Sequence, residues 1–426
     1  MADTLNSPTA ADPAAVPRVL VLANAYSYRL EPFLAAAAKI GVAVVRGLDV
    51  PPAHVRAADD VLGLDFRDAD RAVRQVRAYA ARHPLAAILP TDDATVLLAA
   101  RLGEALGLRH NAVASAEAAR DKLQMRLALQ AAGQRVPSFA AFTVDQPVAA
   151  IVAAVAARIG YPCVVKPTCL SGSRGVIRAN NAAELAAAVE RVRRLLAPLR
   201  QTTLLIEGYL PGREYALEGL LSAGQLHVLA LFDKPDPLEG PYFEETIYVT
   251  PSRADPAAQA ALTACVAEAA AVLGLREGAV HGEARLNDQG AWLLEVAGRS
   301  IGGLCGQTLR FTHSASVTLE ELILRQALGR PVADVARERQ AGGVMMIPIP
   351  AAGTLVGIVG EAAARAVPGV ESVTITAPLH YPLVPLPEGE SYLGFIIARG
   401  ATPEAVEAAL RQAHRALHFE IEPPLA

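Results

Sequence analysis

Cysteine is scarce in this 426-residue chain, and its copies stand far apart. No two of them form a C-x-x-C pair, which excludes a structural zinc cluster built on such pairs. Scattered cysteines are typical of proteins in a reducing compartment, so we expect a cytoplasmic protein. The four cysteines are Cys163, Cys169, Cys265 and Cys305.

Long apolar runs and an excess of basic charge are also missing. No run reaches the roughly 18 residues that a membrane helix needs. The net charge is −4, so no basic field favours nucleic acid as the main partner. Residues 1–17 have neither a basic region nor an apolar segment, so we expect a disordered lead and not a secretory signal.

What the chain does have is length and apolar content. It is 52% hydrophobic with only 5% aromatic residues, which predicts a large, mainly aliphatic core and two or three domains. From residue 18 to 111, strands alternate with helices, which predicts a doubly wound parallel sheet. No G-x-G-x-x-G follows its first strand, so a dinucleotide site is not supported.

The remaining chain divides into two further regions. Residues 112–335 begin with one expected helix over 112–133 and continue with mixed strands and helices. Residues 336–426 have the order of a split βαβ unit, and we expect GIVGEAAARAVPG within it to be a helix. The fold class expected is therefore α/β with α+β.

The stretch HGEARLNDQGAWLLEVAGRS, residues 281–300, predicts a hairpin. A three-residue loop, 288–290, would pair Asn287 with Ala291, and hence Glu283 with Glu295. Alternation along the strands would place a set of side chains on one face. The set is Glu283, Arg285, Leu293, Glu295, Ala297 and Arg299.

Two facing carboxylates need an explanation, because at about 5 Å and an effective dielectric of about 20 they repel by roughly 3 kcal/mol. Magnesium binds a few carboxylates together with water and substrate phosphates. A phosphate-handling metal site is one interpretation of Glu283 and Glu295. A surface hairpin with solvated glutamates is the other.

Two more segments suggest a ligand site, each weakly, and the first of them suggests a phosphate site. YPCVVKPTCLSGSRGV places Lys166 at the end of an apolar strand, and Ser171, Gly172, Ser173 and Gly175 follow. Such a loop lets backbone N–H groups converge on an anion, although its spacing is not that of a P-loop and most Gly/Ser loops bind nothing.

The second segment, LLIEGYLPGREYALEGL, carries Glu207 at the end of a strand and Glu214 after a Pro-Gly turn. Such a hinge can present backbone groups to a base and a carboxylate to ribose hydroxyls. An edge hairpin with two surface acids is the alternative.

Taken together, RDKLQMR, VVKPTCLSGSRGV, IEGYLPGREY, GEARL and LLEVAGRSIGG resemble the ATP-grasp superfamily of carboxylate–amine ligases. The resemblance covers residues from about 112 to 310. Within the superfamily the chain is most similar to the L-amino-acid ligases, which make dipeptides and related amides. The segment FDKPDPLEGPYFEETIYVTPS and the C-terminal region support this closer match.

The resemblance implies a binding site for ATP. Lys122 and Lys166 would contact the phosphates, and the Ser171–Gly175 loop would cover them. Glu207, with the backbone of Tyr209 and Leu210, would form the adenine hinge. The remaining nucleotide contacts implied are Glu214, to ribose, and Leu294.

The resemblance also implies a metal and catalytic set. Glu283 and Glu295 would bind Mg²⁺, with Mn²⁺ as a possible substitute, and Arg299 would steady the acyl-phosphate and the later tetrahedral intermediate. Many members carry Asn at the position of Ala297. Alanine cannot bind metal, which leaves one or two ions open.

Several single residues have two interpretations. In one interpretation Lys234 contacts phosphate or a substrate carboxylate and has a catalytic role. In the other it contacts neither. His281 is expected at the core or an edge, and the alternative is a substrate contact. The backbone of Ser300, Ile301, Gly302 and Gly303 offers N–H groups to a substrate carboxylate.

Two polar groups near the site are expected to be structural. Cys169 is expected to pack, because no histidine is paired with it. Asp92 and Asp93 end a strand where such folds bind ligands, yet helix capping is the favoured interpretation.

The implied reaction joins an amino-acid carboxylate to an amine, with ADP and phosphate released. Another ATP-grasp ligation or carboxylation, or a non-catalytic ATP-binding protein, is the alternative. The expected partners are small carboxylates and amines, with no nucleic acid or membrane and a possible homodimer. The sequence does not specify the substrates, the pathway or the oligomeric state.

Overall fold

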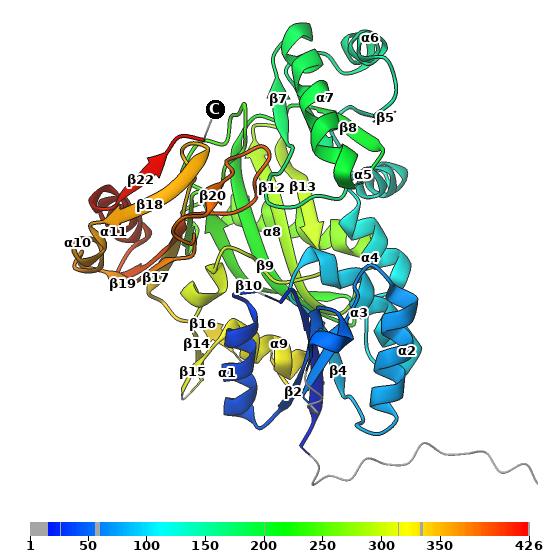
Figure 1. Cartoon of the computed structure of the whole chain (residues 1–426), viewed down its shortest axis with the longest axis vertical. Helices are drawn as coiled ribbons and strands as arrows, with labels where there is room; N and C mark the ends of the chain where they lie inside the picture. Colours follow the sequence, from blue (N-terminus) through cyan, green and yellow to red (C-terminus); the bar gives the residue numbers. More distant parts are fainter. Residues whose placement is uncertain are drawn as a thin grey trace, which may run out of the picture.

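The computed structural model describes residues 16–25, 27–55, 60–199, 201–313, 315–332 and 335–424. Residues 1–15 of the expected N-terminal lead lie outside this part of the chain. The described residues form a mixed α/β molecule with three main bodies, which are an N-terminal sheet, a four-stranded sheet and a central sheet, with their helices (Figure 1). None of the helices in the described ranges is long and apolar enough to span a membrane.

The first body is a parallel sheet in the order β3-β2-β1-β4, which confirms the doubly wound pattern. Its strand β3 and helix α2 were not anticipated, because β3 has four residues and α2 buries only Ala72, Val76 and Tyr79. The strands are β1 (Arg18–Ala23), β2 (Ala43–Asp49), β3 (Val61–Leu64) and β4 (Ala87–Pro90). The helices are α1 (Leu30–Ile40), α2 (Ala69–Ala80) and α3 (Asp93–Leu106).

The second body is a four-stranded antiparallel sheet in the order β5-β8-β6-β7. Helices α6 and α7 contribute apolar side chains to its core, and Asn181 caps α7 by accepting the N–H of Glu184. The strands are β5 (Phe139–Thr143), β6 (Cys163–Pro167), β7 (Ile177–Ala179) and β8 (Thr203–Gly208), and the helices are α6 (Val148–Arg158) and α7 (Ala182–Leu196).

The central sheet has eight strands in the order β13-β12-β9-β10-β11-β17-β21-β19. It runs through the predicted boundary at residues 335–336, because β11 pairs with β17. Helix α8 (Pro256–Val272) packs on one end and α11 (Pro403–Ala416) on the other. The strands are β9 (Arg213–Ser222), β10 (Gln225–Asp233), β11 (Ile247–Thr250), β12 (Gly278–Asn287), β13 (Gly290–Ala297), β17 (Ala341–Ile347), β19 (Val370–Ile375) and β21 (Gly394–Gly400).

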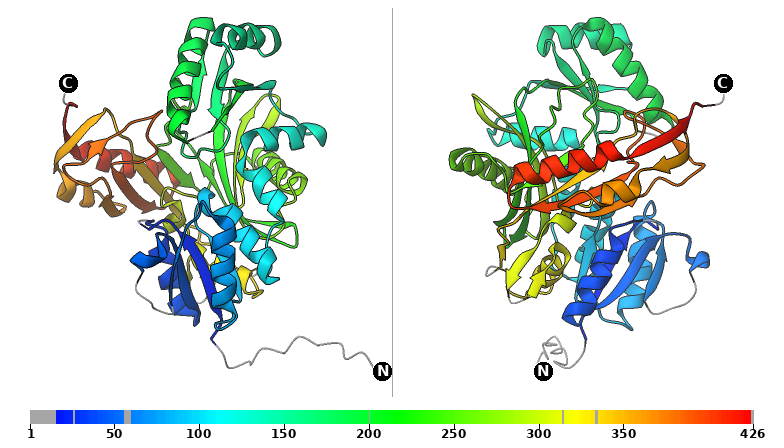
Figure 2. Two further views of the ribbon diagram at one scale, coloured as in Figure 1. Left: turned by 45° about the vertical axis from the view of Figure 1, so that its right-hand side comes forward. Right: turned by 90° about the vertical axis from the view of Figure 1, so that its left-hand side faces the viewer.

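Two views turned from the first show α11 along the C-terminal part of the sheet, away from the N-terminal body (Figure 2).

Further helices and strands lie between and after the three bodies. They are α4 (Val113–Arg120), α5 (Lys122–Ala131), β14 (Phe311–His313), β15 (Ala315–Val317), α9 (Leu319–Ala327), β16 (Ala336–Arg337), β18 (Gly353–Val359), α10 (Glu361–Arg365), β20 (Pro382–Leu383) and β22 (His418–Glu422).

The prediction of a single helix over 112–133 is wrong, because the helix is interrupted at Asp121, between α4 and α5. Asp121 has extended backbone angles, and its carboxylate accepts the N–H groups of Leu123 and Gln124 as an N-cap. The N–H of Lys122 donates to Thr168 O at 2.9 Å. The break therefore starts α5 at Lys122 and ties that residue to the loop after β6.

The β12–β13 hairpin pairs Glu283 with Glu295, as predicted, but through a different register. The turn has two residues, since Asn287 pairs with Gly290 and its side chain accepts the N–H of Gln289. A bulge in β13 restores the glutamate pairing. The bulge moves Leu293 into the core, so its predicted place on the glutamate face is wrong.

The helix expected over GIVGEAAARAVPG is also wrong in part. Residues through Val359 belong to strand β18, which pairs with β22. Gly360 then takes a left-handed conformation, with φ of 91°, and only Glu361–Arg365 is helical. An added Cβ at Gly360 would lie 1.8 Å from Ala416 O, so this turn requires glycine.

We expect Gly282→Ala to destabilise the protein by about 1–3 kcal/mol, because overpacking a tight core is costly. A Cβ at Gly282 would lie 2.6 Å from Val266 Cγ1 of α8. The measurement is the midpoint of urea unfolding. In a protein that carries Val266→Ala, the further change Gly282→Ala is expected to cost less stability than it costs in the wild type, because the shorter side chain leaves room for the added Cβ. An unchanged midpoint in Gly282→Ala alone would contradict the packing.

Candidate active site

A cavity of about 540 Å³ lies where the three bodies meet. We call it the central cavity. Its wall contains nearly all of the residues singled out from the sequence, drawn from segments more than 180 residues apart. Those that line it are Lys122, Lys166, Ser171, Gly172, Ser173, Glu207, Tyr209, Leu210, Glu214, His281, Glu283, Leu294, Glu295, Arg299, Gly302 and Gly303.

Glu207 is the most deeply buried acid of one end of the cavity. It accepts from Arg126 Nε at 2.5 Å and pairs with Lys166 Nζ at 2.6 Å. Burial by itself raises the pKa of Glu207, but the charges of Arg126 and Lys166 outweigh it and lower the pKa to about 2. Burial also lowers the pKa of the Lys166 ammonium. This end is therefore a fixed ionic network with one acid between two cations.

The loop between β6 and β7, residues 170–176, covers the same end, and we call it the flap. Lys122 Nζ donates to Leu170 O at 2.8 Å. Three flap residues have left-handed backbone angles, namely Gly172, Ser173 and Gly175. At Gly175 an added Cβ would lie 2.6 Å from the Pro167 ring, so glycine is needed to fold the flap back on β6.

The segment after β8 carries the predicted adenine hinge. Its backbone is partly engaged within the protein, since Tyr209 N–H donates to Pro162 O at 3.0 Å and Leu210 O accepts from Arg285 Nη1 at 2.7 Å. The Tyr209 ring lies under the guanidinium of Arg178, 4.1 Å from the ring centre. The hinge role stays a prediction.

The two facing glutamates of the hairpin are each bound by a lysine from another segment. Glu295 lies 3.1 Å from Lys122 Nζ, and Glu283 accepts a hydrogen bond from Lys234 Nζ. Burial lowers the pKa of Lys122, but the charge of Glu295 outweighs it and raises the pKa. The lysines offset the repulsion that the hairpin alone would suffer.

Lys234 lies behind the cavity wall, with 3% of its side chain exposed. Its ammonium also bonds Glu214 at 2.7 Å and Glu245 at 2.8 Å. Burial raises the pKa of Glu245 to about 7, despite the charge of Lys234. Glu283 differs, because Lys234 and His281 overcome its burial and hold its pKa well below the usual range.

These acids are also suited to hold a cation. Oxygen atoms of Glu214, Glu245 and Glu283 lie within 4.8 Å of one another, and carboxylate oxygens are ligands that Mg²⁺ prefers. Glu245 was not found from the sequence, although it lies within FDKPDPLEGPYFEETIYVTPS, the segment that supported the closer resemblance.

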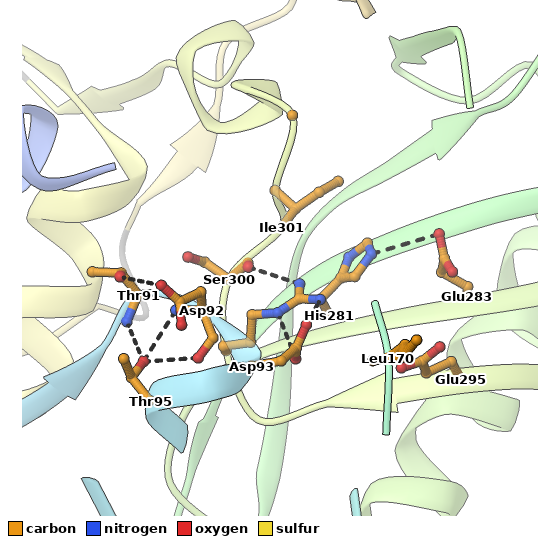
Figure 3. A network of polar contacts seen from close by, with 12 residues as sticks. Thr91, Asp92, Asp93, Thr95, Leu170, His281, Glu283, Glu295, Ser300 and Ile301 are labelled. Carbon is orange, nitrogen blue, oxygen red and sulfur yellow. Dashed lines mark hydrogen bonds and ion pairs between the residues drawn. The ribbon is translucent and has the colours of Figure 1, made fainter. Parts of the chain in front are cut away.

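Arg299 also lines the cavity, and its guanidinium donates two hydrogen bonds to Asp93, which lies at the start of α3 beside the loop of Ser300 and Ile301 (Figure 3). Its Nε donates to Asp93 Oδ1 at 2.9 Å and its Nη2 to Oδ2 at 2.8 Å. Burial alone lowers the pKa of Arg299, but Asp93 raises it well above the usual value. The carboxylate fixes the plane of a guanidinium that stays charged.

Capping was the favoured interpretation of both aspartates, and it is wrong for Asp93. Asp92 is the residue before α3, and its N–H donates to Thr95 Oγ1 at 3.2 Å. Asp93 is the first helical residue and binds Arg299, 206 residues away. Only the folded chain brings these two segments together.

The loop after Arg299 is held by three further residues. Arg29 Nη2 donates to Ser300 O at 2.9 Å, and Tyr28 OH accepts the N–H of Gly303 at 3.0 Å. The N–H of Ile301 donates to the buried Glu218 at 2.9 Å. The expectation of free N–H groups at Ile301 and Gly303 is therefore wrong.

His281 lines the cavity beside Glu283, with its Nε2 3.8 Å from Glu283 Oε1 (Figure 3). Burial lowers the pKa of His281, so the ring is neutral near pH 7. Cys169 lies outside the cavity wall and donates to Asp121 at 3.2 Å. Burial raises the pKa of its thiol, which agrees with a packing role.

Family profiles match three successive parts of the chain. The profile described as ATP-grasp N-terminal domain matches residues 34–110, and the ATP-grasp domain profile matches residues 159–308. The profile described as L-amino acid ligase C-terminal domain 2 matches residues 345–422. The chain belongs to the ATP-grasp family.

Among curated relatives of this ATP-grasp protein is the alanine–anticapsin ligase of Bacillus subtilis, 28% identical over 255 residues. The match covers 55% of this chain and 52% of that protein, so the chain spans about half the length of the curated relatives it matches.

Solved structures share the fold. The L-amino acid ligase of Bacillus licheniformis has a TM-score of 0.81 at 24% identity, covering 95% of this chain and 99% of that one. The biotin carboxylase domain of the 2-oxoglutarate carboxylase of Hydrogenobacter thermophilus, in complex with MgADP, ADP and bicarbonate, has a TM-score of 0.66 at 18% identity. That match covers 95% of this chain and 90% of that chain.

We expect Glu207→Gln to lower the free energy of unfolding by about 3–5 kcal/mol at pH 7, because Arg126 and Lys166 would stay buried without their counter-charge. The folded-state pKa of about 2 is below the usual 4.5. The contribution of the carboxylate is thus complete above pH 4.5 and is lost as the pH falls towards 2. Urea unfolding of both proteins across this range measures it, and a constant difference between them would contradict the network.

Proposed function

We propose that this ATP-grasp protein is an ATP-dependent ligase that joins an amino-acid carboxylate to an amine and releases ADP and phosphate. The observation that carries the proposal is one cavity whose wall combines three features. Lys122 and Lys166 lie beside the flap, Glu283 and Glu295 face each other on the hairpin, and Arg299 lines the same cavity.

ATP would bind under the flap. Lys122 and Lys166 are placed to neutralise phosphate oxygens, and Ser171, Gly172 and Ser173 would cover them. Glu207, Tyr209, Leu210 and Leu294 line the adjoining wall and are proposed for the adenine end, with Glu214 towards the ribose. Lys122 and Lys166 are bound to carboxylates that phosphate would replace as partners.

Mg²⁺, or Mn²⁺ in its place, fits the carboxylates of this wall. Glu283 and Glu295 are the proposed ligands, with Glu245 close to Glu283. An ion held by these carboxylates would supply positive charge against the phosphoryl group during its transfer. Ala297 lines the same cavity without offering a ligand atom.

The chemistry follows from a poor leaving group. An amine cannot displace oxide from a carboxylate, so the carboxylate oxygen first takes the terminal phosphoryl group of ATP, and ADP leaves. The amine then attacks the acyl-phosphate carbon, phosphate departs with the bonding electrons, and the amine loses a proton. Arg299, whose guanidinium plane is fixed by Asp93, is proposed to stabilise negative charge in both steps.

Amino acids are the proposed substrates. The relative named alanine–anticapsin ligase and the C-terminal profile of L-amino acid ligases support this class. The cavity also offers carboxylates and guanidinium groups within one wall, which suits a molecule bearing both charges. Gly302 and His281 are proposed substrate contacts, whereas the N–H of Gly303 is already bound to Tyr28. A catalytic role for Lys234 would be indirect, through the three glutamates it binds.

The homodimer and the cytoplasmic location stay predictions. The four cysteines are free thiols in the structure, which is compatible with a reducing compartment.

The first experiment is release of ADP and phosphate with Mg²⁺-ATP across pairs of amino acids, with mass spectrometry of the products. We expect release that depends on the pair, together with a new amide mass. Stimulation by bicarbonate or by non-amino-acid carboxylates alone would move the proposal to another ligation. ATP binding without release in any mixture would refute the enzyme.

Lys166→Ala, Glu295→Ala and Arg299→Ala are each expected to lower kcat by about 10²–10³, since each removes a charge that acts on the reacting phosphoryl group. Thermal unfolding and circular dichroism of each variant serve as the folding control. Turnover like that of the wild type in a folded variant would remove that residue from the proposed machinery.

A further inference from the structure

The flap is held from outside by the C-terminal region. Residues 385–392, which we call the clamp loop, run from β20 towards β21 and lie beside the segment leading into β7 (Figure 1). Gly175 N–H donates to Pro387 O at 2.8 Å, and Arg174 Nε donates to Glu388 O at 2.8 Å. Two backbone carbonyls of the clamp loop thus bind two successive residues of the flap.

A side-chain pair anchors the clamp loop to the same body as the flap. Glu388 accepts two hydrogen bonds from Arg191 of α7, at 2.5 and 2.8 Å. The hydroxyl of Tyr242 also accepts from Arg191, and Tyr242 forms a β-bridge with Ile177 directly after the flap. Carbonyls and carboxylate of one loop therefore engage both the flap and the helix behind it.

The clamp loop has a shape that its glycine permits. Gly389 N–H donates to Pro385 O at 2.9 Å, which closes a tight turn. A Cβ at Gly389 would lie 1.8 Å from Val384 O. Any larger residue must open the turn, which would displace the two carbonyls that bind the flap.

The far end of the clamp loop reaches the central cavity. Glu390 and Tyr392 line the cavity. Glu390 also pairs with Arg174 of the flap at 3.7 Å, and Tyr392 packs against Phe395 of β21, with ring centres 6.0 Å apart. One continuous loop therefore contacts the flap with residues 387, 388 and 390 and reaches the cavity at 390 and 392.

We propose that the clamp loop positions the flap over the cavity, with Glu388 and Arg191 as positioning residues. Building on the ligase function proposed above, the clamp would keep water from the acyl-phosphate while the amine attacks. Because the same loop also contacts the cavity, a substrate bound in the cavity would favour the closed position of the flap. A looser clamp would let water compete with the amine, so ADP would form without amide.

The test compares wild type with Glu388→Ala and Arg191→Met in two assays. The first is the rate of tryptic cleavage after Arg174 in the presence of Mg²⁺-ATP, followed by mass spectrometry. We expect each variant to be cleaved about two- to fivefold faster, the range for loss of an exposed ion pair. The double variant is expected to resemble Arg191→Met, because that variant already removes the pair with Glu388 together with the hydrogen bond to Tyr242.

The second assay is the ratio of ADP to amide formed. It is expected to rise in both variants while the affinity for ATP, measured by calorimetry, stays within about twofold of wild type. Gly389→Ala displaces the carbonyls themselves, so it is expected to raise the ratio of ADP to amide more than Glu388→Ala or Arg191→Met does. Glu361→Gln is the matched control, since Glu361 forms an equally exposed pair with Arg365 on α10 and is expected to change neither assay.

Equal tryptic rates in wild type, Glu388→Ala and Gly389→Ala would overturn the clamp, whatever reaction the protein performs. Faster cleavage with an unchanged ratio of ADP to amide would overturn its role in excluding water. If wild type makes no amide from any pair, the proposed ligation fails, and the tryptic assay still decides whether the loop holds the flap.

Discussion

Charge neutralisation within a buried wall is the constraint on which this site depends. A carboxylate or ammonium removed from water costs several kcal/mol unless an opposite charge lies close to it. Lys122, Lys166, Lys234 and Arg299 each stand against a carboxylate from a segment distant in sequence. Each pair also joins separate parts of the chain, so the wall that would bind ATP also fixes how those parts meet.

The same constraint explains why charged residues are shared between neighbours. Lys234 serves three glutamates, and their pKa values move in opposite directions, up for Glu245 and down for Glu283. One proton held by Glu245 near neutral pH lowers the excess negative charge around one lysine. A cation that entered the cluster would displace such a proton, so binding and protonation compete there.

Much of the site could be predicted from the sequence, because local order carried it. The strand before Lys166, the Gly/Ser loop after it and the facing glutamates of the hairpin each lie within about twenty residues. The partners of Asp93, Arg126 and Arg29 could not be found in this way, since they lie 81 to 271 residues away. The bulge in the hairpin could not be predicted either. The alternation of apolar and polar residues in the sequence is compatible with the register of a three-residue loop and with that of a two-residue turn followed by a bulge.

The fold shows the same division. Parallel strands follow from apolar runs, and helix starts follow from residues of the N-capping type such as Asn181 and Thr402, whose side chains accept the N–H groups of Glu184 and Ala405. Helix α2 was missed because its buried stripe is narrow, and the helix break at Asp121 because its cap lies inside a helical pattern. Both depend on contacts with other segments.

The eight-stranded sheet has a consequence for dissecting the protein. Strands β11 and β17 share a ladder across the connection between the central and C-terminal regions. A fragment ending before β17 would present the apolar strand IYVT as an open edge, with β17, β21 and β19 missing beside it. Open apolar edges recruit other strands and favour aggregation. Chimaeras that exchange C-terminal regions among relatives therefore need an exchange point before β11, so that β11 and β17 come from the same parent protein.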